Sequence, residues 1–288
     1  MSKPPFKPKP GQIDYTNLRR APVINCVVKY KDKILLVKRS PDMHLYPNYW
    51  NGISGFLDEN KPIKDKVKAE LKEEISLNAH HVLSIKQGKV FEQEAAEYNK
   101  TWIVHPILVE VDTDTITLDW EAQSYEWIGP GEIFKYPLLP GFDIVIKNFF
   151  KIFYAGGFLY NQKKESVLLH KRDNKTQVNP NKWGFFGGTN SGNETPEECF
   201  RRELREELAI EVPLERIKPL RDYFNIDRGV HRYVFFVESN ARKSDMKLGE
   251  GADFDWIPLN AVLNYDLTTK TMLDLQFFIE NKTEPKEK

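Results

Sequence analysis

Three glutamates in the C-terminal half of the chain have the spacing of metal ligands on a helix. Glu203, Glu206 and Glu207 are related as i, i+3 and i+4, which places their carboxylates on one helix face. Like charges at these spacings repel one another. A hard divalent cation among the oxygens would remove this repulsion, and ligation by oxygen alone suits Mg²⁺ or Mn²⁺.

The element that must position these glutamates is a helix with a defined start. Thr195 supplies an N-cap hydroxyl, and Pro196 suits the first helical position. A glycine turn at Gly188 and a polar loop precede this start. The competing interpretation is a solvated helix with mixed charges, because Glu197 and Arg201 lie one turn apart.

The full pattern around this helix decides against a merely solvated helix, because it resembles the signature of the Nudix hydrolases. The matching positions are Gly188, five residues, Glu194, seven residues, Arg202-Glu203-Leu204, one residue, Glu206-Glu207, one residue, Ala209-Ile210. Ala209 stands where the family usually has glycine. The change matters only if the backbone there takes a positive φ, because alanine otherwise favours the helix.

The N-terminal half repeats this pattern at a fixed offset. Trp50 matches Trp183, and Gly55 matches Gly188, each pair lying 133 positions apart (183 − 50 and 188 − 55). Glutamates recur at the same offset, namely Glu70, Glu73 and Glu74. Agreement without gaps over this stretch predicts two domains of the same kind in tandem.

The repeat divides the chain into an arm and two domains. Residues 1–15 are rich in proline and lysine and are expected to form a flexible arm. Residues 16–150 would form the first Nudix-like domain, and residues 151–288 the second. By the resemblance, each domain is an α/β sandwich of α/β/α type around a mixed β-sheet.

Apolar patterning predicts a similar order of elements in both halves. For the first half it predicts strands at 23–30, 34–38, 82–91, 101–111 and 125–128, with helices at 63–75 and 142–150. For the second half it predicts strands at 152–160, 166–170, 221–225, 231–237 and 254–257, with helices from Thr195 and at 268–280.

The two copies of the signature are unequal. Lys61 stands where the signature has glutamate, Ala69 where it has arginine, and Ser76 where it has glycine. In the second copy Glu194 and Arg202 are both present, and such an arginine would orient a ligand carboxylate through charge-assisted hydrogen bonds. We therefore expect catalysis in the second domain. The first would hold a second, degenerate site made of Glu70, Glu73, Glu74 and Glu121.

The resemblance implies hydrolysis of a diphosphate linkage in a nucleotide-type substrate, usually a nucleoside diphosphate linked to a group X. A divalent ion would neutralise phosphate charge and activate water. The implied metal ligands are Glu203, Glu206 and Glu207. The implied catalytic residues are Glu206, Glu207, Glu250 and Arg202, and the implied substrate-binding residues are Arg172, Gly187 and Gly188.

Two of these roles have plain structural alternatives. Glu250 lies six residues before Trp256, where some Nudix enzymes place a metal-associated or basic glutamate, but it is also a glutamate in a polar loop. Glu121 lies at the same distance before Trp127. Arg172 resembles a phosphate-contacting arginine of the family, and the alternative is an exposed charge at the end of a strand.

Composition limits the other function classes. Among 288 residues, Lys plus Arg and Asp plus Glu both number 42, so net charge is zero and nucleic acid is not expected as a bulk electrostatic partner. Cys26 and Cys199 are expected to be packed thiols in a reducing compartment. No apolar run is long enough to span a bilayer and no secretory pattern starts the chain, so we expect no membrane partner and a cytoplasmic location.

Two other classes of function stay open, together with the reason for having two domains. The chain would be a nucleotide sensor if its domains bind without turnover, and another chemistry such as isomerisation is compatible with the same fold. Apolar residues near the domain boundary, among them Phe142, Phe150 and Phe153, favour a fixed pairing of the two domains over a free linker. Homo-oligomers are compatible with the same surfaces.

Overall fold

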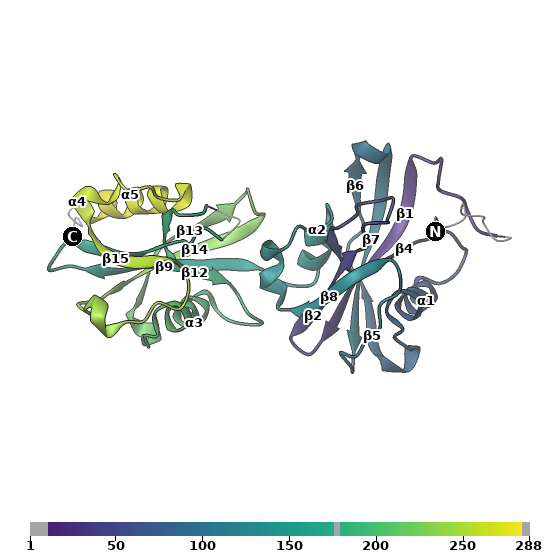
Figure 1. The fold of residues 1–288 in the computed structure, drawn as a ribbon, viewed down its shortest axis with the longest axis horizontal. Coiled ribbons are helices and arrows are strands. Elements are labelled where there is room, and N and C mark those ends of the chain that lie inside the picture. Colours follow the sequence, from purple (N-terminus) through teal and green to yellow (C-terminus); the bar gives the residue numbers. More distant parts are fainter. Residues whose placement is uncertain (1–10, 176–178, 284–288) are drawn as a thin grey trace. The chain divides into compact units, whose positions relative to one another are not determined.

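The chain divides into two compact units in the computed structural model, which describes residues 11–175 and 179–283. The division falls between Lys151 and Ile152. Each unit holds one β-sheet with its own helices (Figure 1).

The first unit is built on an eight-stranded mixed sheet. Its strands run in the order β3-β2-β1-β7-β5, with β4 paired to β1, β6 to β7 and β8 to β2. Strands β1 and β7 are parallel, and the other pairs are antiparallel. The strands are β1 Arg20–Tyr30, β2 Lys33–Arg39, β3 Trp50–Asn51, β4 Ile53–Phe56, β5 Val82–Gln87, β6 Phe91–Ala95, β7 Lys100–Val111 and β8 Ala122–Ile128.

Two α-helices pack on this sheet, α1 (Ile63–Ile75) and α2 (Phe142–Lys147), and Figure 1 shows them on opposite sides of it. Helix α1 buries Val67, Leu71 and Ile75 against β1, β2 and β7. Helix α2 buries Phe142, Val145 and Ile146. Short 3₁₀ turns occur in both units at Ala79–His81, Ala96–Tyr98, Pro130–Lys135, Leu214–Arg216 and Lys243–Asp245.

The second unit repeats this plan with a seven-stranded mixed sheet in the order β11-β10-β9-β14-β13, where β12 pairs with β9 and β15 with β10. Its strands are β9 Phe153–Asn161, β10 Ser166–Lys171, β11 Trp183–Gly184, β12 Phe186–Thr189, β13 Ile217–Asn225, β14 Val230–Glu238 and β15 Asp253–Pro258. Its helices are α3 Pro196–Leu208, α4 Leu259–Val262 and α5 Thr269–Thr283. Figure 1 shows α3 on one face of the sheet and α4 and α5 on the other. The predicted α/β/α sandwich around a mixed sheet is confirmed.

Alternation along the strands gives the second unit two separate cores. On the α3 face, Phe200 and Leu204 pack against Phe153, Ala155 and Phe235. On the α5 face, the side chains that pack together include Phe158, Val234, Leu275 and Phe278. Because successive residues of a strand point to opposite faces, the residues that alternate with those of one core point to the other face of the sheet.

The helices that carry the glutamates follow the predicted pattern closely. Helix α1 has the predicted bounds, Ile63–Ile75. Helix α3 begins at Pro196 after the N-cap Thr195, whose hydroxyl accepts a hydrogen bond from the Glu198 amide. The Glu198 carboxylate accepts one from the Thr195 amide in return, and this reciprocal pair fixes the first turn of the helix.

The single strand predicted at 82–91 is wrong, because β5 and β6 are separate strands that pair with different parts of β7. The break lies opposite Pro106, which has no N–H to donate to the ladder. One hydrogen bond remains there, from the Gly88 amide to the Pro106 carbonyl. The helix predicted at 142–150 is shorter and ends at Lys147.

Both cysteines are buried free thiols, as predicted. Most of the apolar side chains near the domain boundary also belong to the core of one unit. Phe142, Val145 and Ile146 are buried on α2, which packs on β1 and β7, and Phe153 lies in the α3-side core. Their apolar character is therefore explained without a pairing of the two domains. Within the described ranges, no helix has the length and apolarity that a membrane span requires.

Candidate functional site

The guanidinium of Arg202 lies among three carboxylates of the second unit. Its Nε donates to Glu194 Oε1 at 2.7 Å, and its Nη1 donates to Glu203 Oε1 at 2.7 Å and to Glu206 Oε2 at 3.0 Å. Its Nη2 donates to the Thr189 carbonyl at 3.0 Å. One cation thus offsets the repulsion between carboxylates that the helix spacing creates, and it connects α3 to the end of β12.

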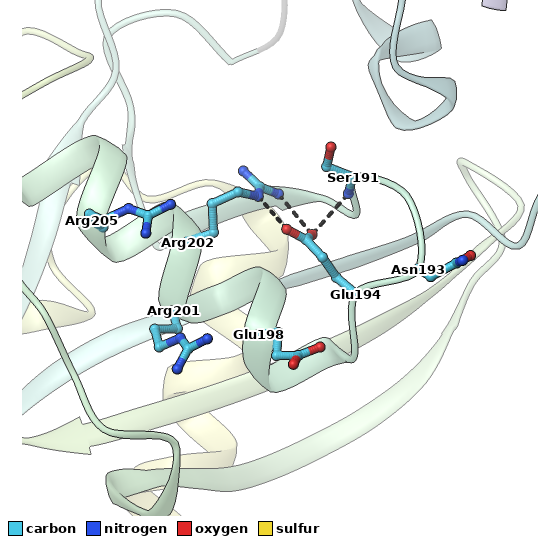
Figure 2. Close-up of a pocket in the computed structure, with 7 residues that line it drawn as sticks. All are labelled: Ser191, Asn193, Glu194, Glu198, Arg201, Arg202 and Arg205. Carbon is cyan, nitrogen blue, oxygen red and sulfur yellow. Dashed lines mark hydrogen bonds and ion pairs between the residues drawn. The ribbon is translucent and has the colours of Figure 1, made fainter. Parts of the chain in front are cut away.

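Glu194 anchors the loop before α3 to the same arginine. Its Oε2 accepts a hydrogen bond from the Ser191 amide at 2.9 Å, and Figure 2 shows the Glu194 carboxylate turned toward Arg202. A pocket of about 330 Å³ opens here, lined by Ser191, Asn193, Glu194, Glu198, Arg201, Arg202 and Arg205. The pocket includes none of the three expected metal ligands, so it lies beside the carboxylate cluster and does not contain it.

The glycine turn allows Glu203 to approach the backbone. A Cβ atom at Gly188 would clash with Glu203 Oε1, and Gly187 has a φ of +138° with a Cβ position that clashes with β9. Only glycine therefore permits this contact between the turn and the helix. Burial raises the pKa of Glu203 to about 7, although the nearby Arg202 opposes the shift.

Glu207 is the buried member of the cluster, with 5% of its surface exposed. Its Oε2 lies 3.6 Å from Nδ1 of His170, and within the described parts of the chain it has no hydrogen-bond partner. A buried carboxylate oxygen without a partner is unfavourable unless a cation satisfies it. This oxygen and the all-oxygen donor set of Glu203, Glu206 and Glu207 fit Mg²⁺ or Mn²⁺.

The described residues contain no preformed group of three His, Cys, Asp or Glu side chains that could hold a metal ion. Arg202 lies against Glu203 and Glu206 instead, while Glu207 points toward His170. Arg202 takes only one oxygen of each carboxylate, Oε1 of Glu203 and Oε2 of Glu206, so the second oxygen of each is not used by Arg202.

His170 was not predicted from the sequence. It is buried on β10, and both of its ring nitrogens lack a hydrogen-bond partner among the described residues. The position 133 residues earlier is Val37 (170 − 37), so this imidazole beside the glutamates is specific to the second unit. The signal available in the sequence was a polar residue inside an apolar strand. The buried polar atoms of His170 and Glu207 face each other without hydrogen-bond partners among the described residues, which is unusual for a purely structural pair.

Glu250 is exposed and lies on a loop anchored at both ends to the site. The Gly249 amide donates to the Glu207 carbonyl at 2.8 Å, and the Ala252 amide donates to the Lys171 carbonyl at 2.8 Å. A Cβ at Gly249 would clash with the Glu206 carbonyl, so this approach requires glycine. The loop thereby brings Glu250 to the C-terminal end of α3.

Arg172 follows the last residue of β10, and its amide donates to the Lys182 carbonyl at 2.9 Å. The residue Arg228 as a whole is exposed. Its pKa is nevertheless lowered, mainly by desolvation of the guanidinium and secondly by repulsion from Arg172. Arg172, after the end of β10, and Arg228, in the β13–β14 turn, thus lie within electrostatic reach of each other.

The first unit supports its glutamates in a different way. Lys66 Nζ lies 2.6 Å from Glu70 Oε1 and 3.4 Å from Oδ1 of the buried Asp58. At the offset of 133, Lys66 corresponds to Cys199 and Asp58 to Ser191 (199 − 66 and 191 − 58). Glu70 therefore has a cationic partner. The two signatures do not reveal it, because the lysine is at position 66 and not at position 69, which corresponds to Arg202.

The remaining carboxylates of the first unit are only partly brought together. The Ser54 amide donates to Glu74 Oε1 at 3.1 Å. Burial, followed by the charges of Glu70 and Glu121, raises the pKa of Glu74 well above its ordinary value. Glu70, Glu74 and Glu121 are thus neighbours, whereas Glu73 is exposed to solvent.

The departure at Ala209 matters for stability, because this residue caps α3 with a φ of 55°. We expect Ala209→Gly to stabilise the second unit by about 1 kcal/mol, since the left-handed region costs an L-residue about 1–2 kcal/mol and glycine loses somewhat more entropy on folding. Thermal unfolding measures the effect. Ala69→Gly is the control, because glycine in the middle of α1 should lower the Tm. A lower Tm for Ala209→Gly would contradict the assigned strain.

Comparison with known proteins places this geometry in a family. The NUDIX domain model matches residues 19–149 and again residues 152–275. The nucleoside triphosphatase NudI of Klebsiella pneumoniae is 30% identical over 124 residues, covering 40% of this chain and 88% of that protein. NudI of Enterobacter sp. is 28% identical over 122 residues, covering 39% and 86%.

Solved structures of similar fold include two further proteins. A MutT protein of Methanosarcina mazei is 24% identical and covers 46% of this chain and 96% of its own, with a TM-score of 0.39. The Ap4A hydrolase of C. elegans is 18% identical and covers 45% and 94%, with a TM-score of 0.37. Each aligns with less than half of the chain.

Proposed function

This chain belongs to the Nudix family as a pyrophosphohydrolase with two Nudix domains in tandem, and from that premise we propose that its second domain hydrolyses a diphosphate linkage in a nucleotide-type substrate with the help of Mg²⁺ or Mn²⁺. The substrate would be a nucleoside diphosphate linked to a group X, which includes nucleoside triphosphates. The product would leave as two phosphate-bearing fragments.

One observation supports this proposal above the others: the buried Oε2 of Glu207, without a hydrogen-bond partner among the described residues, lies next to two glutamates held by Arg202. Glu203, Glu206 and Glu207 would hold the divalent ion. When bound, this ion would neutralise phosphate charge and lower the pKa of a water molecule.

The other site residues have roles that follow from their placement. Glu250, exposed on its anchored loop, would accept the proton of the attacking water. Arg172 would bind phosphate oxygens, since a guanidinium matches their geometry. Gly187 allows the close approach of β9 and Gly188 that of Glu203, and we propose that a substrate phosphate would lie against this turn. Arg202 would keep the carboxylates of Glu203 and Glu206 oriented toward the metal ion.

The test is a substrate screen with the purified full chain. Nucleoside triphosphates, dinucleoside polyphosphates, ADP-ribose and nucleotide sugars would be incubated with Mg²⁺, and the released phosphate products identified. We expect turnover of at least one substrate and its loss with a chelator. Binding of these nucleotides with no product from any of them would instead support a nucleotide sensor.

For the first domain we propose a mainly structural or substrate-shaping role. The combined change Glu73→Gln and Glu74→Gln should leave kcat within about threefold of wild type, because Glu73 is exposed and this copy lacks the signature arginine. Steady-state kinetics measures the effect, with the same pair of changes at Glu206 and Glu207 as the matched control. An inactive Glu73/Glu74 variant would instead make the first domain a catalytic site.

We also propose a cytoplasmic location for this chain. Two buried free thiols are compatible with the reducing cytoplasm. The intramolecular pairing of the two domains, and a homo-oligomer, remain predictions that scattering and sedimentation of the full chain would test.

A further inference from the structure

Asp274 is a fully buried carboxylate on α5 that the proposed reaction does not use. None of its surface is exposed. Its Oδ2 accepts a hydrogen bond from Arg232 Nε at 3.1 Å and one from the Tyr223 hydroxyl at 3.4 Å, and its Oδ1 lies 3.3 Å from Arg221 Nε. One negative charge is shared by two arginines, so the group keeps an excess positive charge inside the domain.

Arg232 is the more deeply placed of the two arginines, with 9% of its side chain exposed. Its guanidinium carbon lies 4.3 Å from the centre of the Tyr154 ring. Asp274 takes the Nε donor, and even with another donor directed to the Tyr154 hydroxyl the guanidinium has N–H groups left. The Tyr154 ring and the Asp274 carboxylate hold the guanidinium of Arg232 in place. The N–H groups that these two residues do not use can donate to another acceptor.

The strand register places this arginine close to the glycine turn of the signature. Arg232 pairs with Tyr154, and Tyr154 pairs with Thr189, so Arg232 lies two strand spacings, about 10 Å, from Thr189. The Tyr154 hydroxyl lies 2.5 Å from the position that a Cβ at Gly156 would occupy. Burial raises the pKa of Tyr154, the charge of Arg232 opposes this shift, and the charges of Glu207 and Glu203 add to it.

Further positive charge lies next to Arg232. Repulsion from Arg232 contributes to the lowered pKa of Arg228, after desolvation and the larger contribution of Arg172. Arg228 thus lies within electrostatic reach of both Arg172 and Arg232. A concentration of arginine forks is complementary to an anion rich in oxygen, above all a phosphate group.

The equivalent strand positions of the first domain carry no such network. Its register pairs Phe56 with Val23 and Val23 with Val104, which are the counterparts of Thr189, Tyr154 and Arg232. Apolar residues therefore fill the equivalent positions in the same fold. The buried polar group is not needed to build a domain of this kind, and it occurs in the copy with the complete signature.

We propose that Arg232 binds a phosphate group of the substrate on the α5 side of the second domain, and that Asp274 is the positioning residue that holds its guanidinium. The inference rests on the proposed function for the identity of the ligand. Its alternative is a purely structural connection between α5 and β14, which predicts a loss of stability and no effect on binding.

The probe is inorganic pyrophosphate, titrated into the full chain in the presence of a chelator so that binding does not depend on a metal ion. Calorimetry should give a Kd for wild type that rises about tenfold or more in Arg232→Gln. Arg221→Gln is the matched control, because Arg221 shares Asp274 but stacks on Tyr223 and Phe277, with 28% of its side chain exposed. It should lower Tm and leave the Kd unchanged.

Kinetics provides a second measurement with the best nucleotide substrate. Arg232→Gln should raise KM about tenfold while kcat stays within about threefold, as expected when binding is lost equally in ground and transition states. Should Arg232→Gln fail to fold, Arg232→Lys keeps the charge beside Asp274 and still loses the planar fork, so its Kd should rise severalfold.

Two results would overturn the inference: no pyrophosphate binding by wild type, or a Kd and KM in the Arg232 variants equal to those of wild type while Tm falls as in Arg221→Gln. Failure of the proposed function looks different. In that case no nucleotide is hydrolysed, while pyrophosphate binding still depends on Arg232.

Discussion

Replacing Glu207 with glutamine is expected to lower kcat by on the order of 10² or more with the best substrate and Mg²⁺. Glutamine keeps the size of the side chain and removes the negative charge that a divalent ion requires. The fold should persist, because a carboxylate oxygen that is buried without a hydrogen-bond partner among the described residues contributes little to stability or opposes it. We therefore expect a Tm that does not fall together with a large loss of turnover.

The control for Glu207→Gln is Glu211→Gln. Glu211 follows the same helix, is exposed, and forms a long ion pair of 3.9 Å with Arg205. It should leave kcat and Tm close to wild type, since such surface pairs contribute little. Near-normal turnover in Glu207→Gln would show that the second domain is not the catalytic one.

The parts of the structure that local patterns determine were predicted well. The bounds of α1 and the start of α3 follow from apolar spacing and from a cap made by residues three positions apart. The predicted strand at 82–91 failed because its pairing depends on Pro106, which lies in another strand. A local pattern contains no information about the partner strand.

The candidate site shows the same limit. The link between Arg202 and Glu194 was accessible because the family signature contains both residues. The ion pairs of Lys66 with Glu70 and Asp58 could not be predicted in this way, because the lysine and the aspartate occupy positions outside the family signature. Arg232 and Asp274 are 42 positions apart, and only the packing of α5 on the sheet brings them together.

Glu250→Gln tests the remaining role in the proposed reaction. If Glu250 accepts the proton of the attacking water, the change should lower kcat by about 10²–10⁴ and leave KM nearly unchanged, because the base acts in the transition state. Its side chain is exposed, but the backbone on either side is hydrogen-bonded to the carbonyls of Glu207 and Lys171. This anchoring holds a surface glutamate beside the expected metal ligands.

Glu121→Gln is the matched control, because Glu121 lies at the same distance before the tryptophan in the first domain (127 − 121 and 256 − 250). Turnover should be unaffected by it if catalysis belongs to the second domain. An ordinary loop glutamate at position 250 would give a kcat/KM within about threefold of wild type. That result would remove Glu250 from the mechanism and require the proton to go to another group near Glu207, of which His170, 3.6 Å away, is the first to test by substitution.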